Sequence, residues 1–460
     1  MVADAVVIDG YTQGTGTVTT SDDASVNTLA AGDDAVLLIE LNGVGASGGN
    51  GMQFSAGTDD SIVRGLIING FATGIRRDGS NARVLGNFIG SDSTGQVAIP
   101  NGAGISSSGN GGHQIGTAAD ADRNIISGNG NGVIPINRGL DPILVQNNYI
   151  GLNRSGTSAL PNSGSGIFLT GVFAGASGNI VIGATSTVNG KGTVISGNTG
   201  NGITFNVGSG SFMGNVNIQA NLIGMAADGV AALGNGGGGI EDITDPASTN
   251  SGVIILHNLI SANGLDGITY ASDSAFVLGN QIGSDITGQL DRGNAAVGIQ
   301  IPGDRRDPTD LTKTQITIGS SSSTAMNQIS ANKLGGIVLR NANAVIEGNL
   351  NRHPNRPSYA SRQRQRWILI YNVLADPTLA VTVGGLSPTS GNVIAFNAAD
   401  GVRVVASTVA LQHNSIFSNG PDESTIGEGL GINLGNGPEL PRMTPATPTL
   451  ARTACKISPP

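Results

Sequence analysis

Aromatic and charged residues are both scarce in this chain. Phe, Trp and Tyr make up 3% of the 460 residues, and Asp, Glu, Lys and Arg together make up 12%. A core built around large rings is therefore excluded, and the remaining apolar residues, mostly Ile, Val, Leu and Ala, suit thin β layers. Basic residues number 23 against 32 acidic ones, which gives a net charge of −9. This balance argues against a nucleic-acid partner, because neutralising phosphates requires Lys and Arg.

Cysteine, long apolar runs and a leader sequence are also missing. Cys455 is the single cysteine, so no intrachain disulfide can form. No apolar run approaches the roughly 20 residues of a membrane span, and "MVADAVVIDG" lacks the basic and apolar regions of a signal peptide. Because the chain enters strand-like sequence at once, we expect a piece of a longer exported chain rather than a cytosolic protein.

Glycine is abundant, and one glycine-rich phrase recurs. "GNFIGSDSTG" at 86–95 returns as "GNQIGSDITG" at 279–288, with looser copies at 147–156 and 220–229. The central isoleucines are Ile89, Ile150, Ile223 and Ile282, which lie 61, 73 and 59 residues apart. Phrases ending in Gly-Ile or Gly-Val divide each long period into about three units of roughly 20 residues. A repeat of this size indicates a solenoid.

The repeated unit decides which solenoid it is. No stretch of about 10–12 residues has helical spacing, so leucine-rich, ankyrin and tetratricopeptide repeats are excluded. Short Ile/Val strands separated by Gly or Asn could form hairpins, but a meander does not need identical units. A coil of three short parallel strands does need similar units, because each coil stacks on the next. The sequence therefore predicts an all-β parallel solenoid over 1–440, of about twenty coils and roughly 90–100 Å in length.

Inward isoleucines and corner asparagines explain why the phrase is repeated. We expect Ile89 and its counterparts to stack as an aliphatic core, while Gly and Asn take left-handed corner positions. Stacked asparagines should form amide ladders, each side chain hydrogen-bonded to the next. The two predicted ladders contain Asn87, Asn148, Asn221 and Asn280, and Asn129, Asn198, Asn263 and Asn332.

These phrases resemble those of right-handed parallel β-helix proteins of the pectin-lyase-like class. The resemblance is closer to long, repetitive exported bacterial proteins that carry GNxIGTDxxG and NxISGNxxxGI repeats. The opening "VVIDGYTQ" and "AVLLIELNG" at 35–43 are similar to the head of that group. The resemblance implies a right-handed, single-stranded β-helix and an extracellular or cell-surface location. It implies no particular activity.

Two function classes follow: a non-catalytic surface rod for adhesion or carbohydrate contact, and a carbohydrate-active enzyme, such as a polysaccharide lyase, glycoside hydrolase or epimerase. Hydrolysis needs paired carboxylates, and uronan lyases need a base and usually a calcium-binding Asp cluster. The polygalacturonase series "NTD", "DD", "GHG" and "RIK" is absent, the Asp-Pro pairs lack a following His-Glu, and the four histidines lack metal spacing. The rod is therefore favoured, and no catalytic residue is assigned.

Two charged clusters are the candidate binding sites. "RRD" at 76–78 follows a strand, and "GDRRDPTDLTK" at 303–313 interrupts a coil as a loop, where binding residues often lie. The candidate residues are Arg76, Arg77, Asp78, Asp304, Arg305, Arg306, Asp307 and Asp310. The second cluster could hold an acidic sugar or a calcium ion; no other cofactor is expected. Asp92 and Asp285 are predicted to form turns, and Trp367 is the one tryptophan that could stack on a sugar.

Two stretches break the pattern. "NRHPNRPSYASRQRQRWILI" at 351–370 stands where a fifth copy of the phrase is due. Written as CGG CAA CGG CAA CGG TGG and shifted by one base, "RQRQRW" becomes Gly-Asn-Gly-Asn-Gly-Gly, and "RHPNRP" likewise becomes Gly-Thr-Arg-Thr-Gly. A shift in 442–460 gives "DDPGDADTGANGLQNFP". We expect an irregular loop at 352–366 and a disordered tail at 441–460; the alternative is a native basic insertion that binds a polyanion.

Overall fold

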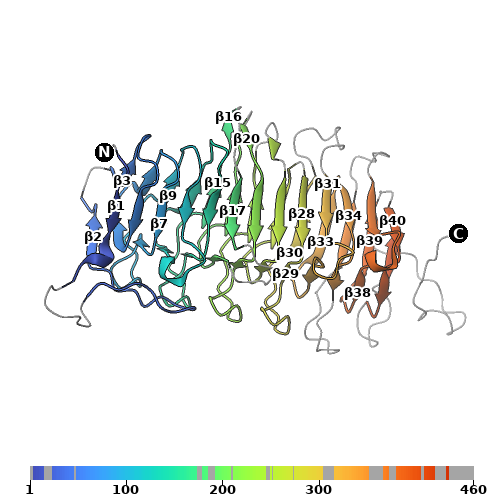
Figure 1. Ribbon diagram of the computed structural model, residues 1–460. Helices are drawn as coiled ribbons and strands as arrows, with labels where there is room; N and C mark the ends of the chain where they lie inside the picture. The colour runs from blue at the N-terminus through green and yellow to red at the C-terminus, as the bar shows by residue number, and fades with distance from the viewer. Residues whose placement is uncertain are drawn as a thin grey trace, which may run out of the picture.

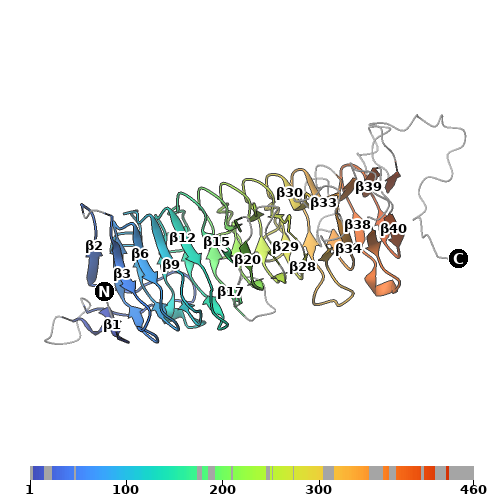
Figure 2. The same ribbon diagram turned by 90° about the horizontal axis from the view of Figure 1, so that it is seen from above.

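Three long parallel sheets run side by side along the molecule, each built from 13 strands in the described part of the chain. In the computed structural model, Figures 1 and 2 show these strands stacked as the rungs of a rod. The structure describes residues 4–14, 23–45, 48–173, 179–184, 192–208, 211–244, 249–250, 252–272, 274–303, 315–351, 366–371, 380–405, 409–419 and 431–434.

The strands of the first sheet are β1 (Val7–Asp9), β4 (Ile62–Arg64), β7 (Arg83–Leu85), β10 (Gln114–Ile115), β13 (Ile143–Val145), β17 (Ile180–Gly183), β21 (Val216–Gln219), β25 (Val253–Leu256), β28 (Ser274–Leu278), β31 (Gln315–Ile318), β34 (Asn343–Ile346), β37 (Val381–Gly384) and β40 (Val409–Gln412). The strands of the second sheet are β2 (Ile39–Asn42), β5 (Leu66–Asn69), β8 (Phe88–Ile89), β11 (Ile125–Ile126), β14 (Tyr149–Ile150), β18 (Val194–Ile195), β22 (Leu222–Ile223), β26 (Leu259–Ile260), β29 (Gln281–Ile282), β32 (Gln328–Ile329), β35 (Leu350–Asn351), β38 (Val393–Ala395) and β41 (Ser415–Phe417).

The strands of the third sheet are β3 (Asn50–Phe54), β6 (Thr73–Arg77), β9 (Ala103–Ser107), β12 (Asn131–Pro135), β15 (Ile167–Leu169), β19 (Ile203–Phe205), β23 (Ile240–Asp242), β27 (Ile268–Thr269), β30 (Val297–Ile301), β33 (Gly335–Arg340), β36 (Ile368–Tyr371), β39 (Val402–Val405) and β42 (Ile432–Leu434). A small fourth sheet contains β16 (Val172–Phe173), β20 (Ser211–Met213) and β24 (Thr249–Asn250). The short 3-10 helices are η1 (Gly10–Thr12), η2 (Asp120–Asp122) and η4 (Pro388–Ser390). None of the helices in the described residues has the length and apolarity needed to cross a bilayer.

Along the chain, successive strands enter the first, second and third sheets in turn, and each pairs in parallel with its counterpart one coil later. This arrangement is an all-β parallel β-helix, as the repeats predict. Such parallel crossovers are right-handed in nearly all proteins.

The coils are longer and fewer than the sequence suggested. Each sheet has 13 strands rather than about twenty, so the stack is about 60 Å long at the usual strand spacing. In the third sheet, Met52 pairs with Ile75 and Ile299 pairs with Ile337, which gives coils of 23 to 38 residues. The difference arises because corners and loops separate the three strands of a coil.

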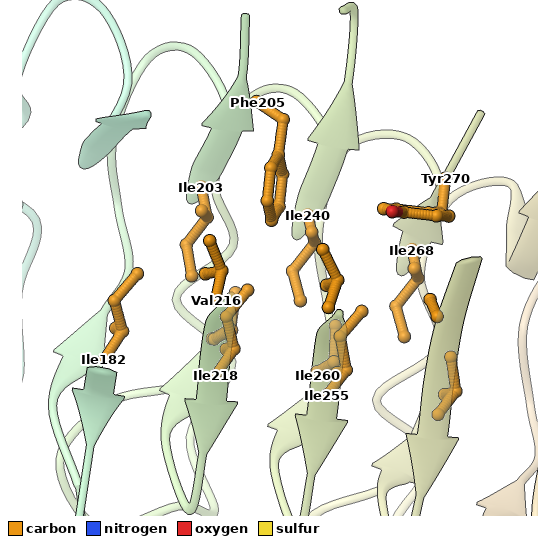
Figure 3. Close-up of a cluster of buried hydrophobic side chains, with 14 of the residues drawn as sticks. Ile182, Ile203, Phe205, Val216, Ile218, Ile240, Ile255, Ile260, Ile268 and Tyr270 are labelled. Atoms are coloured by element: carbon orange, nitrogen blue, oxygen red, sulfur yellow. The ribbon is translucent and has the colours of Figure 1, made fainter. Parts of the chain in front are cut away.

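The long period spans two coils. Ile89 pairs with Ile126, which in turn pairs with Ile150. The isoleucines of the recurring phrase nevertheless point inward as predicted, because Ile89 and Ile282 are both 0% exposed. Figure 3 shows the same stacking in successive coils of the third sheet, where Ile203, Ile240 and Ile268 follow one another along the core.

Two asparagine ladders line the corners beside the second sheet. Side-chain amide bonds join neighbouring asparagines, with Nδ2 donating to the next Oδ1 at 2.8–3.1 Å in the bonds that link Asn87 to Asn124 and Asn148, and Asn198 to Asn235 and Asn263. In the first ladder Thr193 takes the place of an asparagine between Asn148 and Asn221. The predicted members are therefore real members, but they lie in alternate coils: Asn124 stands between Asn87 and Asn148.

The ladders also satisfy the corner backbone. Asn235 donates Nδ2 to the carbonyl of Ile195 at 3.1 Å, while its Oδ1 accepts the backbone N–H of Asn198 at 3.2 Å. The chain turns tightly here: Gly90 has a φ of 93°, and a Cβ on it would clash with Asn129 Oδ1 and the carbonyl of Ser127. The asparagine side chains thus hydrogen-bond both to one another and to the buried backbone groups of the corner.

Asn235→Ala should destabilise the β-helix by about 2–3 kcal/mol, because it leaves two buried donors of Asn198 without an acceptor. Urea unfolding followed by circular dichroism measures the change. Asn42→Ala, at an exposed asparagine of β2, is the control and should stay near the wild-type value. Equal losses in the two variants would contradict the role given to the ladder.

Candidate functional site

The residue that follows each Gly-Ile or Gly-Val phrase faces outward from the third sheet. Strand side chains alternate between faces, so Ile75 is buried whereas Arg76 is exposed, and Ile240 is buried whereas Glu241 is partly exposed. The register of the sheet aligns these residues in a single line, called here the outer column. The outer column consists of Gln53, Arg76, Ser106, Ile134, Phe168, Thr204, Glu241, Thr269, Gln300, Val338, Leu369, Arg403 and Asn433.

The middle of the outer column alternates accessible and covered side chains. Phe168, Glu241 and Gln300 are partly exposed, whereas Thr204 and Thr269, on the coils between them, are buried. Because neighbouring strands are about 4.8 Å apart, the accessible side chains recur at intervals of about 10 Å. The result is a line with one aromatic ring, one carboxylate and one amide on a rigid sheet.

Local hydrogen bonds fix the covered threonines. Thr204 Oγ1 lies 2.7 Å from Ser165 Oγ and accepts from Asn201 Nδ2 at 3.1 Å. Thr269 Oγ1 donates to Asp266 Oδ2 at 3.0 Å. These contacts occupy the threonine hydroxyls within the protein, whereas Phe168, Glu241 and Gln300 are the partly exposed side chains of this stretch.

Glu241 is the carboxylate of the outer column within the described residues. A Cβ built on Gly238 would lie 3.1 Å from Glu241 Oε2 and 3.3 Å from the Asp266 carbonyl, so the glycine makes room for the carboxylate beside that loop. The Asp266 carboxylate itself is engaged, because Oδ1 accepts from the Val297 amide at 2.7 Å and Oδ2 accepts from Thr269. The geometry therefore suits hydrogen bonding to hydroxyls better than two-carboxylate hydrolysis.

Side hairpins project between the second-sheet and third-sheet strands. Isolated antiparallel bridges close them at Ser91–Ala98, Leu152–Ala159, Met225–Ala232 and Ser284–Asp291. They stack through backbone bonds, such as Arg154 N–H to the Gly95 carbonyl at 3.1 Å and Ile286 N–H to the Gly229 carbonyl at 2.9 Å. The recurring polar phrase thus builds a second repeated surface beside the outer column.

The turn-forming role predicted for Asp92 and Asp285 is confirmed. Asp92 Oδ1 accepts from the Val97 amide at 3.1 Å, and Asp285 Oδ1 accepts from the Leu290 amide at 2.9 Å. Burial raises the pKa of both carboxyls, but the hydrogen bonds outweigh it and hold each pKa below the ordinary value. Both carboxylates therefore close their hairpins.

Arg76 and Asp78 lie together at the edge of the third sheet. Arg76 Nε is 3.1 Å from Asp78 Oδ2, and Asp78 also accepts from Gln53 Nε2 at 3.1 Å and from Ser108 Oγ at 2.5 Å. Arg76 belongs to the outer column, far from Glu241 along the rod. Arg76 is exposed, whereas Asp78 is partly buried and its carboxylate is occupied by these three protein donors.

Arg77 lies in the interior, away from any surface ligand. It is 0% exposed and donates Nη1 to the Ala82 carbonyl at 3.1 Å. Burial lowers its pKa to about 9. Nearby, His113 is also fully buried, and its Nδ1 accepts the Ala82 amide at 3.2 Å. Burial, followed by the Arg77 charge, lowers the pKa of His113 to about 2, so this imidazole stays neutral.

The second predicted cluster lies outside the described residues, as do Asp304, Arg305, Arg306, Asp307 and Asp310. Most of 352–366 and all of 441–460 lie outside them too. No group of three or more His, Cys, Asp or Glu side chains in the described ranges could hold a metal ion. Trp367 is fully buried, so it cannot stack on a sugar; Phe168 and Tyr371 are the partly exposed rings on the described strands of the third sheet.

Phe168, Glu241 and Gln300 were not predicted from the sequence, although a signal for them exists. Each directly follows the repeated Gly-Ile, and this position changes from coil to coil while its neighbours do not. A varying residue inside an otherwise constant phrase is one that the fold does not dictate.

No family model matches this chain, and no curated protein matches it. Among solved structures, the crystal structure of the Dettilon tailspike protein (gp208) is similar, with a TM-score of 0.35 and 14% sequence identity. The alignment covers 84% of this chain, which spans 60% of that tailspike chain. Values this low assign no activity to the protein.

The neutral, buried His113 predicts a pH-dependent stability. Because its pKa falls from 6.5 unfolded to about 2 folded, this contribution is complete above pH 6.5 and is lost as the pH falls, by about 1.4 kcal/mol per unit. His113→Gln should therefore lose less stability than the wild type between pH 6.5 and 5 in urea titrations. Burial raises the pKa of Asp33 to about 6, so its contribution to stability grows as the pH falls. This contribution is the same in both proteins and cancels from the difference between their pH profiles. Parallel pH profiles would contradict the assignment.

Proposed function

We propose that this protein is a non-catalytic rod at the cell surface or outside the cell, whose outer column contacts carbohydrate. The observation that supports it is the line of Phe168, Glu241 and Gln300 on a sheet whose inward positions are fully committed to the fold. Because the sheet fixes the backbone at these positions, binding carries an ordering cost for the side chains but not for the backbone.

The chemistry of the line suits a sugar chain. The Phe168 ring offers an apolar face, and the Glu241 carboxylate and Gln300 amide pair with hydroxyl groups. A polysaccharide is itself a repeating polymer, so contacts at regular intervals add along the chain and give avidity from individually modest contacts.

The proposal also includes the structural family of the protein and its place in the cell. The recurring "GNxIGSDxTG" and "GI" phrases support membership of the pectin-lyase-like β-helices and, within them, of the repetitive exported bacterial proteins that they resemble. An extracellular or cell-surface position follows from that resemblance. A longer chain would then carry the part that attaches the rod.

A carbohydrate-active enzyme is the second candidate, and the proximity of Glu241 to the Asp266 loop is what favours it. Hydrolysis would need a second carboxylate free to act as acid, nucleophile or base. Asp266 is instead held by two protein donors, the Val297 amide and the Thr269 hydroxyl.

Phe168→Ala and Glu241→Gln should each weaken polysaccharide binding about tenfold, or ~1.4 kcal/mol, because each removes one accessible contact. Binding is measured by affinity electrophoresis against neutral and acidic polysaccharides, including polygalacturonate. Phe276→Ala is the matched control, since Phe276 is 46% exposed on β28 of the first sheet, and it should bind as the wild type does.

Equal losses in Phe276→Ala and Phe168→Ala would contradict the third sheet as the binding face. New reducing ends or unsaturated uronides, abolished by Glu241→Gln, would overturn the non-catalytic assignment in favour of the enzyme.

A further inference from the structure

Three polar side chains inside the rod retain hydrogen-bonding groups that no described protein atom satisfies. Arg77, Ser107 and His113 are each no more than 1% exposed. The unpartnered atoms are Arg77 Nε and Nη2, Ser107 Oγ and His113 Nε2. Buried polar groups are rarely left in this condition.

The three side chains belong to one small region. Arg77 of β6 and Ser107 of β9 are direct register partners on the inward face of the third sheet. Ala82 links Arg77 to His113, because its carbonyl accepts from Arg77 Nη1 at 3.1 Å and its amide donates to His113 Nδ1 at 3.2 Å. The charge of Arg77 also acts on the His113 pKa, which places the two groups close together.

All the unpartnered nitrogen atoms are donors. Since His113 Nδ1 accepts the Ala82 amide, the proton of the neutral ring lies on Nε2. Arg77 Nε and Nη2 carry only donor hydrogens, and the Ser107 hydroxyl can donate as well. Several donors and no obligatory acceptor therefore lie in one region of the interior.

The region also carries an uncompensated charge. A guanidinium with a pKa of about 9 is protonated at neutral pH. Arg77 takes part in none of the ion pairs of the described residues, which join other arginines to aspartates. A buried cation without a counter-charge is costly, so both charge and donor geometry favour an anion.

We propose that Arg77, Ser107 and His113 bind one small monovalent anion, of the size of chloride or bromide, inside the amino-terminal coils. Complete burial of all three side chains excludes an extended ligand such as a sugar acid. The anion neutralises Arg77 and accepts from Arg77 and His113 together, and it thereby joins the first and third sheets. This inference is independent of carbohydrate binding on the outer face.

Crystals of the full chain grown in bromide test the site directly. An anomalous bromide peak within hydrogen-bonding distance of Arg77 Nε or Nη2 and His113 Nε2 is expected. A water molecule at that position, with no anomalous signal, would overturn the proposal.

Thermal unfolding gives a second, independent test. At constant ionic strength, replacing gluconate by chloride should raise the wild-type unfolding midpoint in proportion to the logarithm of chloride concentration above the dissociation constant. Arg77→Met should lose this dependence, whereas Arg76→Met, at the exposed neighbour, should keep it. A chloride response that is the same in all three proteins, or absent from the wild type, would contradict the site.

A different observation supports a second inference, at the coil that contains Asn351 and Trp367. Asn351 is buried in the isoleucine column, where its neighbouring coils contribute Ile329 and Ile394. Trp367, also buried, precedes an inward Ile368 at a position that is glycine in the adjacent coils, such as Gly336 and Gly401. A Cβ on Gly336 would clash with the Trp367 ring.

The second asparagine ladder is interrupted at the same coil. Asn294 donates to Asn332, and within the described residues Asn332 donates to the carbonyls of Ile282 and Ser330 and to no further asparagine. The ladder resumes at Asn397, whose Oδ1 accepts from Asn351 at 2.7 Å. Within this one coil the isoleucine column, the glycine column and the second asparagine ladder therefore all depart from their pattern.

We infer that 351–367 is translated from a shifted reading frame, bounded by one extra base at codon 351 and one missing base after codon 367. With AAT for Asn351, the text AAT CGG CAC CCG AAC CGG CC contains ATC GGC ACC CGA ACC GGC, or Ile-Gly-Thr-Arg-Thr-Gly. The shift restores an isoleucine at position 351, and the Gly-Asn-Gly-Asn-Gly-Gly text restores an asparagine and a glycine before Ile368. The arginines of this stretch then form no polyanion site.

Resequencing the source DNA across codons 345–370 tests this inference. Reads with one base fewer at codon 351 and one more after codon 367 are expected. Reads that confirm the frame as translated would overturn it and would leave the basic stretch as native sequence.

Discussion

Exact in-register stacking of one coil on the next is the constraint on which the rest of this molecule depends. Parallel strands about 4.8 Å apart place each residue over its counterpart, so an inward side chain packs on the residue at the same position of the next coil. The asparagine ladders express this most strictly, because the Asn198 amide needs Asn235 as acceptor, and Asn235 needs Asn263. Repetition in the sequence is the consequence of repetition in space.

The same constraint leaves the outward positions free. Ile240 is fixed by its neighbours Ile203 and Ile268, but Glu241, one residue later, faces away from the core. Outward residues can therefore change from coil to coil without disturbing the fold, and the proposed carbohydrate contact uses residues that do not repeat. The buried Arg77 is the opposite case, a charged residue at an inward position that needs a partner inside.

Much of the fold could be predicted from the sequence, and much of the site could not. The inward isoleucines, the asparagine ladders and the turn role of Asp92 follow from local phrases with fixed chemistry. The number of coils could not be predicted from these phrases, because loops of variable length separate strands of only two to six residues. Arg77 points inward because it lies two residues after the inward Ile75 on the same strand. Its charge alone suggests the opposite, an exposed side chain.

Side-chain amide hydrogen exchange, measured by NMR on asparagine-labelled protein, tests the stacked ladders most directly. Ladder amides such as those of Asn198 and Asn235 are buried and bonded on both sides, so their exchange should require opening of the coil and be slower by orders of magnitude than that of exposed Asn42. Exchange of the ladder amides at the rate of Asn42 would contradict in-register stacking and, with it, this account of the fold.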